Sequence, residues 1–142
     1  PSPPPPPTSS DPQTTTTNKY NPSIITKSAL AKYQNGDISG AENLYQRALL
    51  DWVDDAIAGL TPPATMRHAV AQLWIAYADL YKKMKQNKRA SEAYESATQC
   101  PVAGGVGEVW VAYAKFHAER ARPRASQRIY LRALTGDAGD AE

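Results

Sequence analysis

The sequence is poor in the residues that form covalent cross-links and metal sites. Its 142 residues include one cysteine, Cys100, and two histidines, His68 and His117. A single thiol cannot close an internal disulfide, and two separated histidines without further cysteines do not make a zinc ligand set. We therefore expect a reducing compartment, no bound metal and no cofactor.

Long apolar runs are missing too. No stretch is long and apolar enough to span a membrane, and no basic segment followed by an apolar one marks a secretion leader. Hydrophobic residues nevertheless make up 42% of the chain and charged residues 21%, as is typical of a globular domain. We expect a packed domain without membrane contact.

Catalytic motifs are also lacking. The GGVG stretch at 104–107 has neither the preceding strand nor the following lysine of a phosphate-binding loop, and we expect an ordinary flexible loop there. Asp51, Asp54 and Asp55 lack the glycine and the closing glutamate of a calcium loop. The sequence therefore predicts no enzyme, and we assign no catalytic, metal-binding or cofactor-binding residue.

Proline is concentrated at the N-terminus. Residues 1–21, PSPPPPPTSSDPQTTTTNKYN, offer almost no apolar side chain to bury, so we expect a disordered tail. The run Pro3 to Pro7 favours a polyproline II helix, which SH3 and WW domains recognise, and recognition of the tail stays open. The last seven residues, 136–142, are expected to fray.

Between residues 22 and 135, apolar side chains recur at helical spacing, and no segment alternates with a period of two. This pattern predicts an all-α domain in which Thr65 caps the third helix and 101–107 form a loop. The expected helices cover about 22–35, 38–60, 66–85 and 88–99, a fifth marked by 109–117, and a sixth that starts at 123.

Two of these segments are similar to each other. Residues 73–101 and 109–134 superimpose without a gap at a 36-residue offset, so that Trp74 aligns with Trp110 and Tyr77 with Tyr113. Residues 35–49 match the second half of the same unit. The positions that repeat, which we expect to pack between helices, are Ala41, Tyr45, Ala48, Trp74, Tyr77, Ala78, Tyr81, Ala90, Tyr94, Ala97, Trp110, Tyr113, Ala114, Ser126, Tyr130 and Ala133.

These positions resemble the tetratricopeptide (TPR) consensus, with a Trp near the start of helix A and a small–aromatic–small pattern in helix B. WVAYAKF at 110–116 and RIYLRAL at 128–134 are more similar to the half-a-tetratricopeptide (HAT) variant. The acidic residue usual at the end of the HAT helix A motif is replaced by Tyr81 and His117. The resemblance implies an antiparallel helix-pair solenoid of about three units and six helices.

The HAT resemblance also implies a function, since proteins of that family are scaffolds of splicing, 3′-end processing and ribosome-assembly particles. On this basis we expect a protein-interaction scaffold in a nuclear RNA-processing assembly, nuclear or cytoplasmic with the nucleus favoured. A general TPR adaptor that binds a peptide or helix in its concave groove is one alternative. A self-associating module, such as a homodimer, is another.

In such a module the exposed side of the first helix of each pair lines the concave groove. Apolar side chains and single charges of both signs alternate there, which favours a peptide or a partner helix over bare phosphate. The expected groove residues are Tyr33, Gln72, Ile75, Asp79, Lys82, Val111, Lys115 and Glu119.

Basic residues gather in the second half of the chain, where 11 of the 16 Lys and Arg lie between Lys82 and Arg132. Stacking of units at a regular offset places two clusters along one edge, where they could bind RNA phosphates or an acidic protein. The alternative is a solvated turn, since no aromatic residue interleaves with these charges. This basic edge comprises Lys83, Lys85, Lys88, Arg89, Arg120, Arg122 and Arg124.

Overall fold

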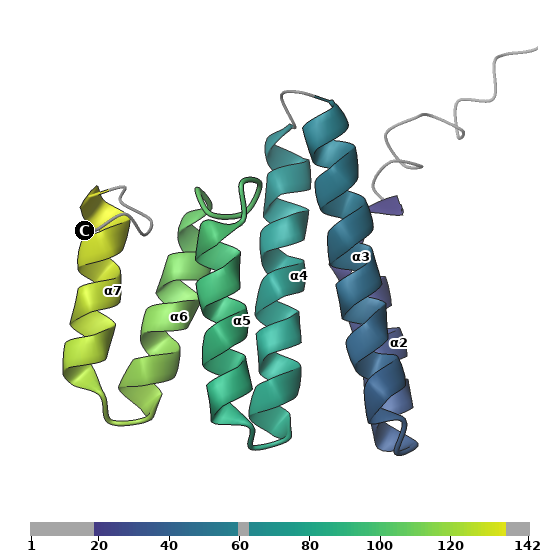
Figure 1. The fold of residues 1–142 in the computed structure, drawn as a ribbon, viewed down its shortest axis with the longest axis horizontal. Coiled ribbons are helices and arrows are strands. Elements are labelled where there is room, and N and C mark those ends of the chain that lie inside the picture. The colour runs from purple at the N-terminus through teal and green to yellow at the C-terminus, as the bar shows by residue number, and fades with distance from the viewer. Residues whose placement is uncertain (1–18, 60–62, 136–142) are drawn as a thin grey trace, which may run out of the picture.

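In the computed structural model, the described residues are 19–59 and 63–135, and they contain six α-helices and no strand (Figure 1). The helices are α2 (Pro22–Gln34), α3 (Ile38–Ala58), α4 (Ala64–Lys83), α5 (Asn87–Gln99), α6 (Gly107–Glu119) and α7 (Pro123–Thr135). The all-α prediction is confirmed for these ranges. The expected tail up to residue 18 and the expected frayed end, 136–142, lie outside the described residues.

Local sequence signals explain where most helices begin. The Asn21 side chain accepts a hydrogen bond from the backbone N–H of Ser23, and Pro22 opens α2 with its fixed φ. Asp37 caps α3 by accepting from Gly40 N at 2.9 Å. The predicted Thr65 cap is wrong, because α4 already begins at Ala64 after the extended Pro63 and has no side-chain cap.

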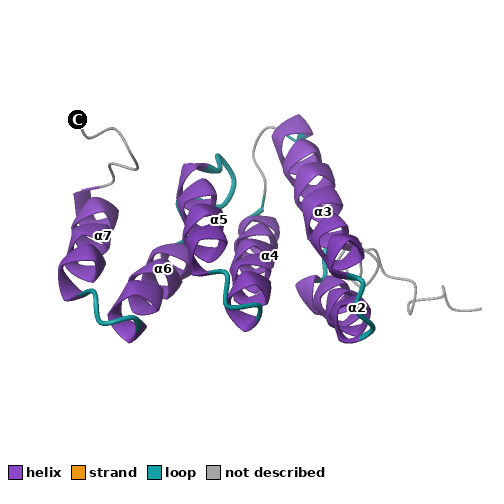
Figure 2. Cartoon of the chain, turned by 60° about the horizontal axis from the view of Figure 1, so that its bottom comes forward, coloured by secondary structure: helices purple, strands orange, loops and turns teal. Residues whose placement is uncertain are grey.

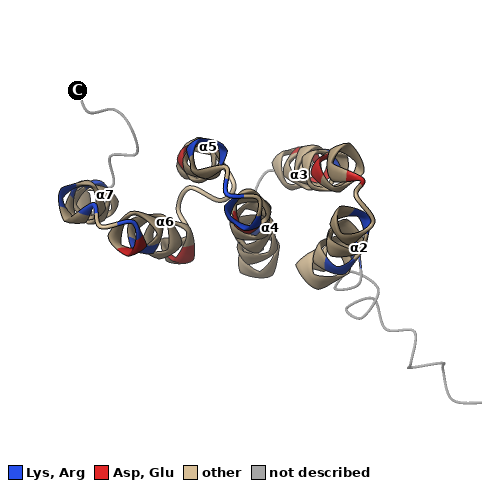
Figure 3. Ribbon diagram, turned by 90° about the horizontal axis from the view of Figure 1, so that it is seen from below, with Lys and Arg blue, Asp and Glu red and all other residues tan. Residues whose placement is uncertain are grey.

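The helices form a row of antiparallel hairpins in two layers (Figures 1 and 3). In one layer α2 contacts α4 and α4 contacts α6. In the other layer, within the described residues, α3, α5 and α7 do not pack backbone to backbone against one another. Each layer is linked to the other, since α3 packs on α4 and α5 packs on α6 (Figure 2). The backbones of the second-layer helices are therefore spaced apart above α4 and α6.

Small side chains let the helices approach closely. Ala41, Ala78, Ala90, Ala97 and Ala114, all predicted packing positions, are fully buried. Close contact at small residues allows the larger aromatic side chains to fill the remaining space between hairpins.

The aromatic contacts repeat with the sequence. The rings of Tyr45 and Tyr77 lie 5.5 Å apart, and those of Tyr94 and Tyr113 lie 5.4 Å apart at the next junction. The turns repeat as well, since Lys85 and Ala121 have positive φ values of 61° and 59°. One structural unit is thus used again along the chain.

Two segments are packed where the sequence predicts mobility. Tyr20, assigned to the tail, lies edge-on to Trp52 with ring centroids 5.6 Å apart, and its hydroxyl donates to Asp55 at 2.7 Å. In the α5–α6 loop, Val102 and Ala103 are buried, and a Cβ at Gly104 would collide with nearby backbone carbonyl oxygens. The loop prediction is confirmed for 101–106, Gly107 already starts α6, and the burial of Val102 and Ala103 shows that part of this loop is packed.

Candidate functional site

The predicted groove residues lie on the three first-layer helices, α2, α4 and α6. Some of their charged side chains form ion pairs with one another. Tyr33 is on α2, while Gln72, Ile75, Asp79 and Lys82 are on α4, and Val111, Lys115 and Glu119 are on α6. The Lys82 ammonium is 3.6 Å from both the Asp79 and the Glu119 carboxylates, so it bridges α4 and α6.

A cavity of about 530 Å³ lies between α2 and α4, beside this face. Of the predicted groove residues, only Asp79 and Lys82 line it, together with Leu30 and Tyr45. Desolvation raises the pKa of the Asp79 carboxyl above its usual value despite the neighbouring Lys82. The structure thus gathers two of the eight predicted groove residues around one cavity.

The basic edge lies at one end of the helices, at the α4–α5 and α6–α7 turns (Figure 3, seen from that end). Arg89 is the exception among its residues, because its guanidinium pairs with Glu42 at 3.2 Å. The others form no ion pair with any described residue. The two clusters sit at neighbouring turns, as the repeat offset predicts.

A further groove was not predicted from the sequence. It has a volume of about 630 Å³ and lies between α3 and α5, with Trp74, Tyr77 and Tyr81 of α4 among its lining residues. Leu49, Leu50 and Val53 of α3 line it from one side, and Glu92, Ser96 and Gln99 of α5 from the other. We call it the open groove.

Trp74 is the unusual residue of the open groove. Its side chain is half-buried, and its indole Nε1 is shielded from solvent without any hydrogen-bond partner among the described residues. A buried N–H without an acceptor costs roughly 1–3 kcal/mol. Because solvent does not reach Nε1 in this structure, an occupant would recover that energy by supplying an acceptor and turning the indole toward the groove.

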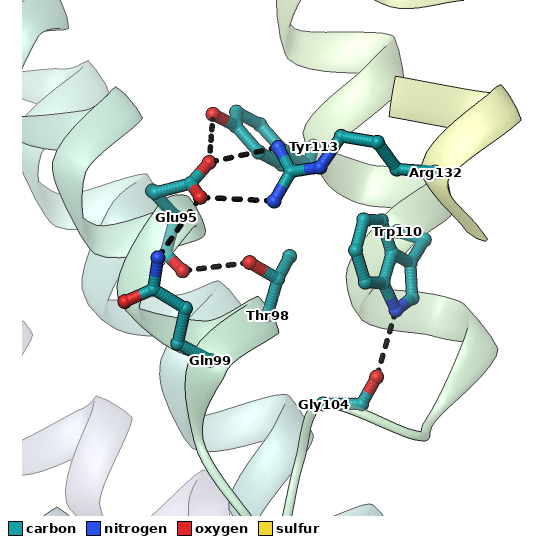
Figure 4. Close-up of polar contacts among 7 residues, drawn as sticks. All are labelled: Glu95, Thr98, Gln99, Gly104, Trp110, Tyr113 and Arg132. Carbon is teal, nitrogen blue, oxygen red and sulfur yellow. Dashed lines mark hydrogen bonds and ion pairs between the residues drawn. The ribbon is translucent and has the colours of Figure 1, made fainter. Parts of the chain in front are cut away.

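The neighbouring groove between α5 and α7 is closed by a side chain (Figure 4). The Arg132 guanidinium stacks over Trp110, 5.3 Å from the ring centroid, and binds both oxygens of Glu95 at 2.9 and 3.1 Å. Trp110 Nε1 donates to the Gly104 carbonyl at 2.8 Å, and the Tyr113 hydroxyl donates to Glu95 at 2.8 Å. The Glu95 carboxylate, the Trp110 N–H and the Tyr113 hydroxyl each have a partner within the chain.

The pKa shifts in the closed groove favour the charged form of the Glu95–Arg132 ion pair. The hydrogen bonds from Arg132 hold the pKa of the Glu95 carboxyl below its usual value, against the effect of partial burial. Burial, with the adjacent Glu95 carboxylate, raises the pKa of the Tyr113 phenol to about 12. At neutral pH the carboxylate is therefore charged and the phenol is a hydrogen-bond donor.

Sequence alignment of the repeats explains why the other groove is open. Ser96 occupies the position of Arg132 at the 36-residue offset, and its side chain is too short to cross the groove. Gln46 takes the place of Glu95 and donates to the Tyr77 hydroxyl at 2.8 Å. The position equivalent to Gly104 is His68, which lies inside the longer α4, so no loop carbonyl reaches Trp74.

The floor of the open groove is held in place by a chain of hydrogen bonds. The Tyr77 and Tyr81 hydroxyls are 3.1 Å apart, and Tyr81 donates to Glu42 of α3 at 2.8 Å. Starting from Gln46, this chain ties α3 to α4 along the groove. A groove with a fixed floor requires little rearrangement when it is filled.

Most predicted packing positions are buried, with three exceptions. Trp74 and Ala133 are half-buried, and Tyr130 is 42% exposed. A packing role for Tyr130 is wrong within the described residues, because α7 is the last described helix and no described helix follows to cover it.

Comparisons with protein-family models, curated proteins and solved structures gave no match to this chain. None of the described helices is both long and apolar enough to cross a membrane. In residues 19–59 and 63–135, no three His, Cys, Asp or Glu side chains form a group that could hold a metal ion. The site is therefore interpreted from its own geometry.

Proposed function

We propose that this protein is a non-enzymatic scaffold of an RNA-processing assembly that holds an arginine-bearing segment of a partner protein in the open groove. The supporting observation is the pair of equivalent grooves, one closed by Arg132 and one open above Trp74. The assignment to RNA processing rests on the HAT resemblance. The proposed solenoid arrangement of helix pairs rests on the same resemblance.

The closed groove indicates the chemistry of the missing occupant. There the tryptophan has a guanidinium on its ring and a backbone carbonyl on its N–H. The open groove presents the same indole, without an acceptor, between an aliphatic wall and a polar wall. An arginine with its peptide carbonyl matches both requirements, since guanidinium groups stack well on indoles.

Charge on the walls favours the same occupant. Glu92 lines the open groove, is exposed, and forms no ion pair with any described residue, so its carboxylate is available to a guanidinium. Leu50, 64% exposed on the opposite wall, offers apolar surface to the rest of the segment. Burial of such surface around a central stacked side chain is how small interfaces gain affinity.

A second candidate, the general adaptor, is favoured by the cavity between α2 and α4. Thr26, Leu30 and Ala76 line it beside the Asp79–Lys82 pair, so it combines apolar walls with both charges. Such a lining suits a peptide or helix of mixed composition. It offers no unpartnered buried donor like Trp74 Nε1, and we therefore rank it second.

Site-specific photocrosslinking in a nuclear extract would separate these functions. A benzoyl-phenylalanine at Leu50, at the open groove, should capture a splicing, 3′-end processing or ribosome-assembly protein. Ser96→Arg, which closes the groove, should remove that crosslink, while Ser39→Arg, on an exposed position outside it, should not.

The same experiment can contradict the proposal. Capture from Ala76, which lines the cavity between α2 and α4, and not from Leu50 would favour the adaptor. Capture of a second copy of this chain would favour self-association. A crosslink from the groove to proteins unrelated to RNA would support the groove as a binding site but contradict the assignment to an RNA-processing assembly.

A further inference from the structure

A small pocket between the start of α5 and the end of α6 is lined by positive charge. Its volume is about 310 Å³, and its lining includes Lys88, Ser91, His117, Arg120 and Arg122 but no acidic residue. Within the described residues the three cations form no ion pair. His117 is 8% exposed, and its Nδ1 has no hydrogen-bond partner.

The preceding junction shows what is missing from this pocket. There Tyr81, the residue equivalent to His117, donates to the Glu42 carboxylate at 2.8 Å, and Arg89 binds the same carboxylate at 3.2 Å. The alignment of α5 with α3 places Ser91 where Glu42 stands. Among the described residues, an anion thus stands at the first junction and none at the second.

The second junction also has more positive charge than the first. The three cations of the pocket take the places of three uncharged residues of the first junction, Ser39, Met84 and Gln86. No described side chain caps the N-terminus of α5, and the first-turn residues Asn87 and Lys88 line the same pocket. Burial, and then the nearby Arg122 and Arg120, lower the pKa of the His117 imidazole, as expected in a positive potential.

We propose that this pocket binds the phosphate group of a phosphorylated serine or threonine in a partner protein, at the position that the Glu42 carboxylate holds in the preceding junction. A phosphate monoester has nearly two negative charges and three acceptor oxygens, which suit three cations, an imidazole and helix N–H groups. The site is separate from the open groove, and it extends the proposed function by naming a modification that the partner carries.

A protein phosphate fits the pocket better than RNA does. The aromatic residues of the lining, Phe116 and His117, are buried and offer no surface on which a base could stack. Arg120 lies over the Phe116 ring, 5.6 Å from its centroid, so its guanidinium is held at the pocket. One enclosed pocket selects a single phosphate, whereas an RNA strand presents many along an extended surface.

The test uses the full chain and four probes: inorganic phosphate, a labelled peptide with one phosphoserine, its serine twin, and a ten-nucleotide oligouridylate. Phosphate should shift the His117 signals in ¹H–¹³C spectra, and the phosphopeptide should bind more tightly than the serine twin or the oligouridylate. Ser91→Glu restores an internal carboxylate and should weaken phosphopeptide binding about tenfold or more. Ser96→Glu, with the same change on the same helix but in the open groove, should change it by less than about twofold, because the added charge is screened.

Three results would overturn the inference. The first is that Ser91→Glu and Ser96→Glu weaken phosphopeptide binding equally. The second is that the His117 signals do not respond to phosphate. The third is that oligouridylate binds more tightly than the phosphopeptide and that Arg122→Ala abolishes its binding. Arg122 is exposed, so Arg122→Ala keeps the fold and should itself weaken phosphopeptide binding. Ser96→Arg closes only the open groove and should leave phosphopeptide binding unchanged, so the two proposals can fail independently.

Discussion

The two grooves beside α5 have equivalent Trp and Tyr residues, Trp74 and Tyr77 in one and Trp110 and Tyr113 in the other, but differ in what crosses them. Above Trp110 an arginine from α7 stacks on the indole and pairs with Glu95, and the groove is closed. Above Trp74 the equivalent residue is Ser96, and a groove of about 630 Å³ remains with an unpartnered indole N–H. In a repeat protein, a contact present in one unit and missing in the next therefore marks a surface available to a partner.

The junctions near Glu42 and Ser91 also differ in one contact, and there the missing partner is an anion. Tyr81 reaches a carboxylate supplied by Glu42, whereas His117 faces Ser91 and a set of unpaired cations. The groove proposed to bind a cation and the pocket proposed to bind an anion thus both lie beside α5. The following predictions test these contrasts, from the largest expected effect to the smallest.

Truncation of the two tryptophans should have unequal costs. Trp110→Ala removes a buried, stacked and hydrogen-bonded ring and should lower the free energy of unfolding by about 3–5 kcal/mol. Trp74→Ala should cost about 1–2 kcal/mol, because its ring lines an open groove and an unsatisfied N–H is removed with it. Urea unfolding monitored by circular dichroism measures both, and equal losses would break the comparison.

Removal of the ion pair that closes the α5–α7 groove should have an intermediate effect. Arg132→Met should cost about 1–2 kcal/mol at pH 7, since the pair has two hydrogen bonds but is partly solvent-exposed. Arg128→Met, on the same helix without a described partner, should change stability by less than about 0.5 kcal/mol.

The same pair predicts a pH dependence. The folded-state pKa of Glu95 lies below its usual 4.5, so its contribution is present above that pH and is lost as the pH falls through the depressed value. The difference between wild type and Arg132→Met should therefore shrink in acid. A difference that stays constant from pH 7 to strong acid would show that Glu95 does not stabilise the groove by its charge.

Copying the closed groove onto the open one should stabilise the protein slightly. Gln46→Glu with Ser96→Arg recreates the pair over Trp74 and should add about 0.5–1 kcal/mol, whereas Ser96→Arg alone should change stability by less than about 0.5 kcal/mol. Thermal unfolding of both variants checks this. A marked destabilisation would mean that the two grooves are not equivalent in shape.

The smallest effect concerns His117. Its folded-state pKa is lowered by burial and by Arg122 and Arg120, so below its usual value of 6.5 the unfolded chain takes up a proton that the folded chain does not. Stability should fall as the pH drops from 6.5 through the folded-state pKa. Unfolding curves at neutral and mildly acidic pH should show this slope in His68→Gln and lose it in His117→Gln.

The sequence predicts the helices well because their positions depend on local signals. Apolar spacing, proline and the caps at Asn21 and Asp37 are read within a few residues, and the ends of α2, α3, α5 and α7 lie close to the predicted ones. The start of α4 is missed because Thr65 has the chemistry of a cap, while the fixed geometry of Pro63 sets the helix two residues earlier.

The open groove could not be predicted from the same signals. Trp74 occupies a packing position of the repeat, and its exposure depends on residue 96 of another helix. The alignment of Ser96 with Arg132 contained that information, but only the structure shows that Arg132 crosses to the tryptophan. The packing of Tyr20 on Trp52 likewise joins residues far apart in the chain.

The central claim, that the open groove takes an arginine with its carbonyl, can be tested on the indole N–H signals of the three tryptophans. N-acetyl-arginine amide, at about millimolar concentration, should shift the Trp74 signal, leave Trp110 and Trp52 unchanged, and lose its effect in Ser96→Arg. No shift at Trp74, an equal shift at Trp110, or the same response to N-acetyl-leucine amide would contradict it.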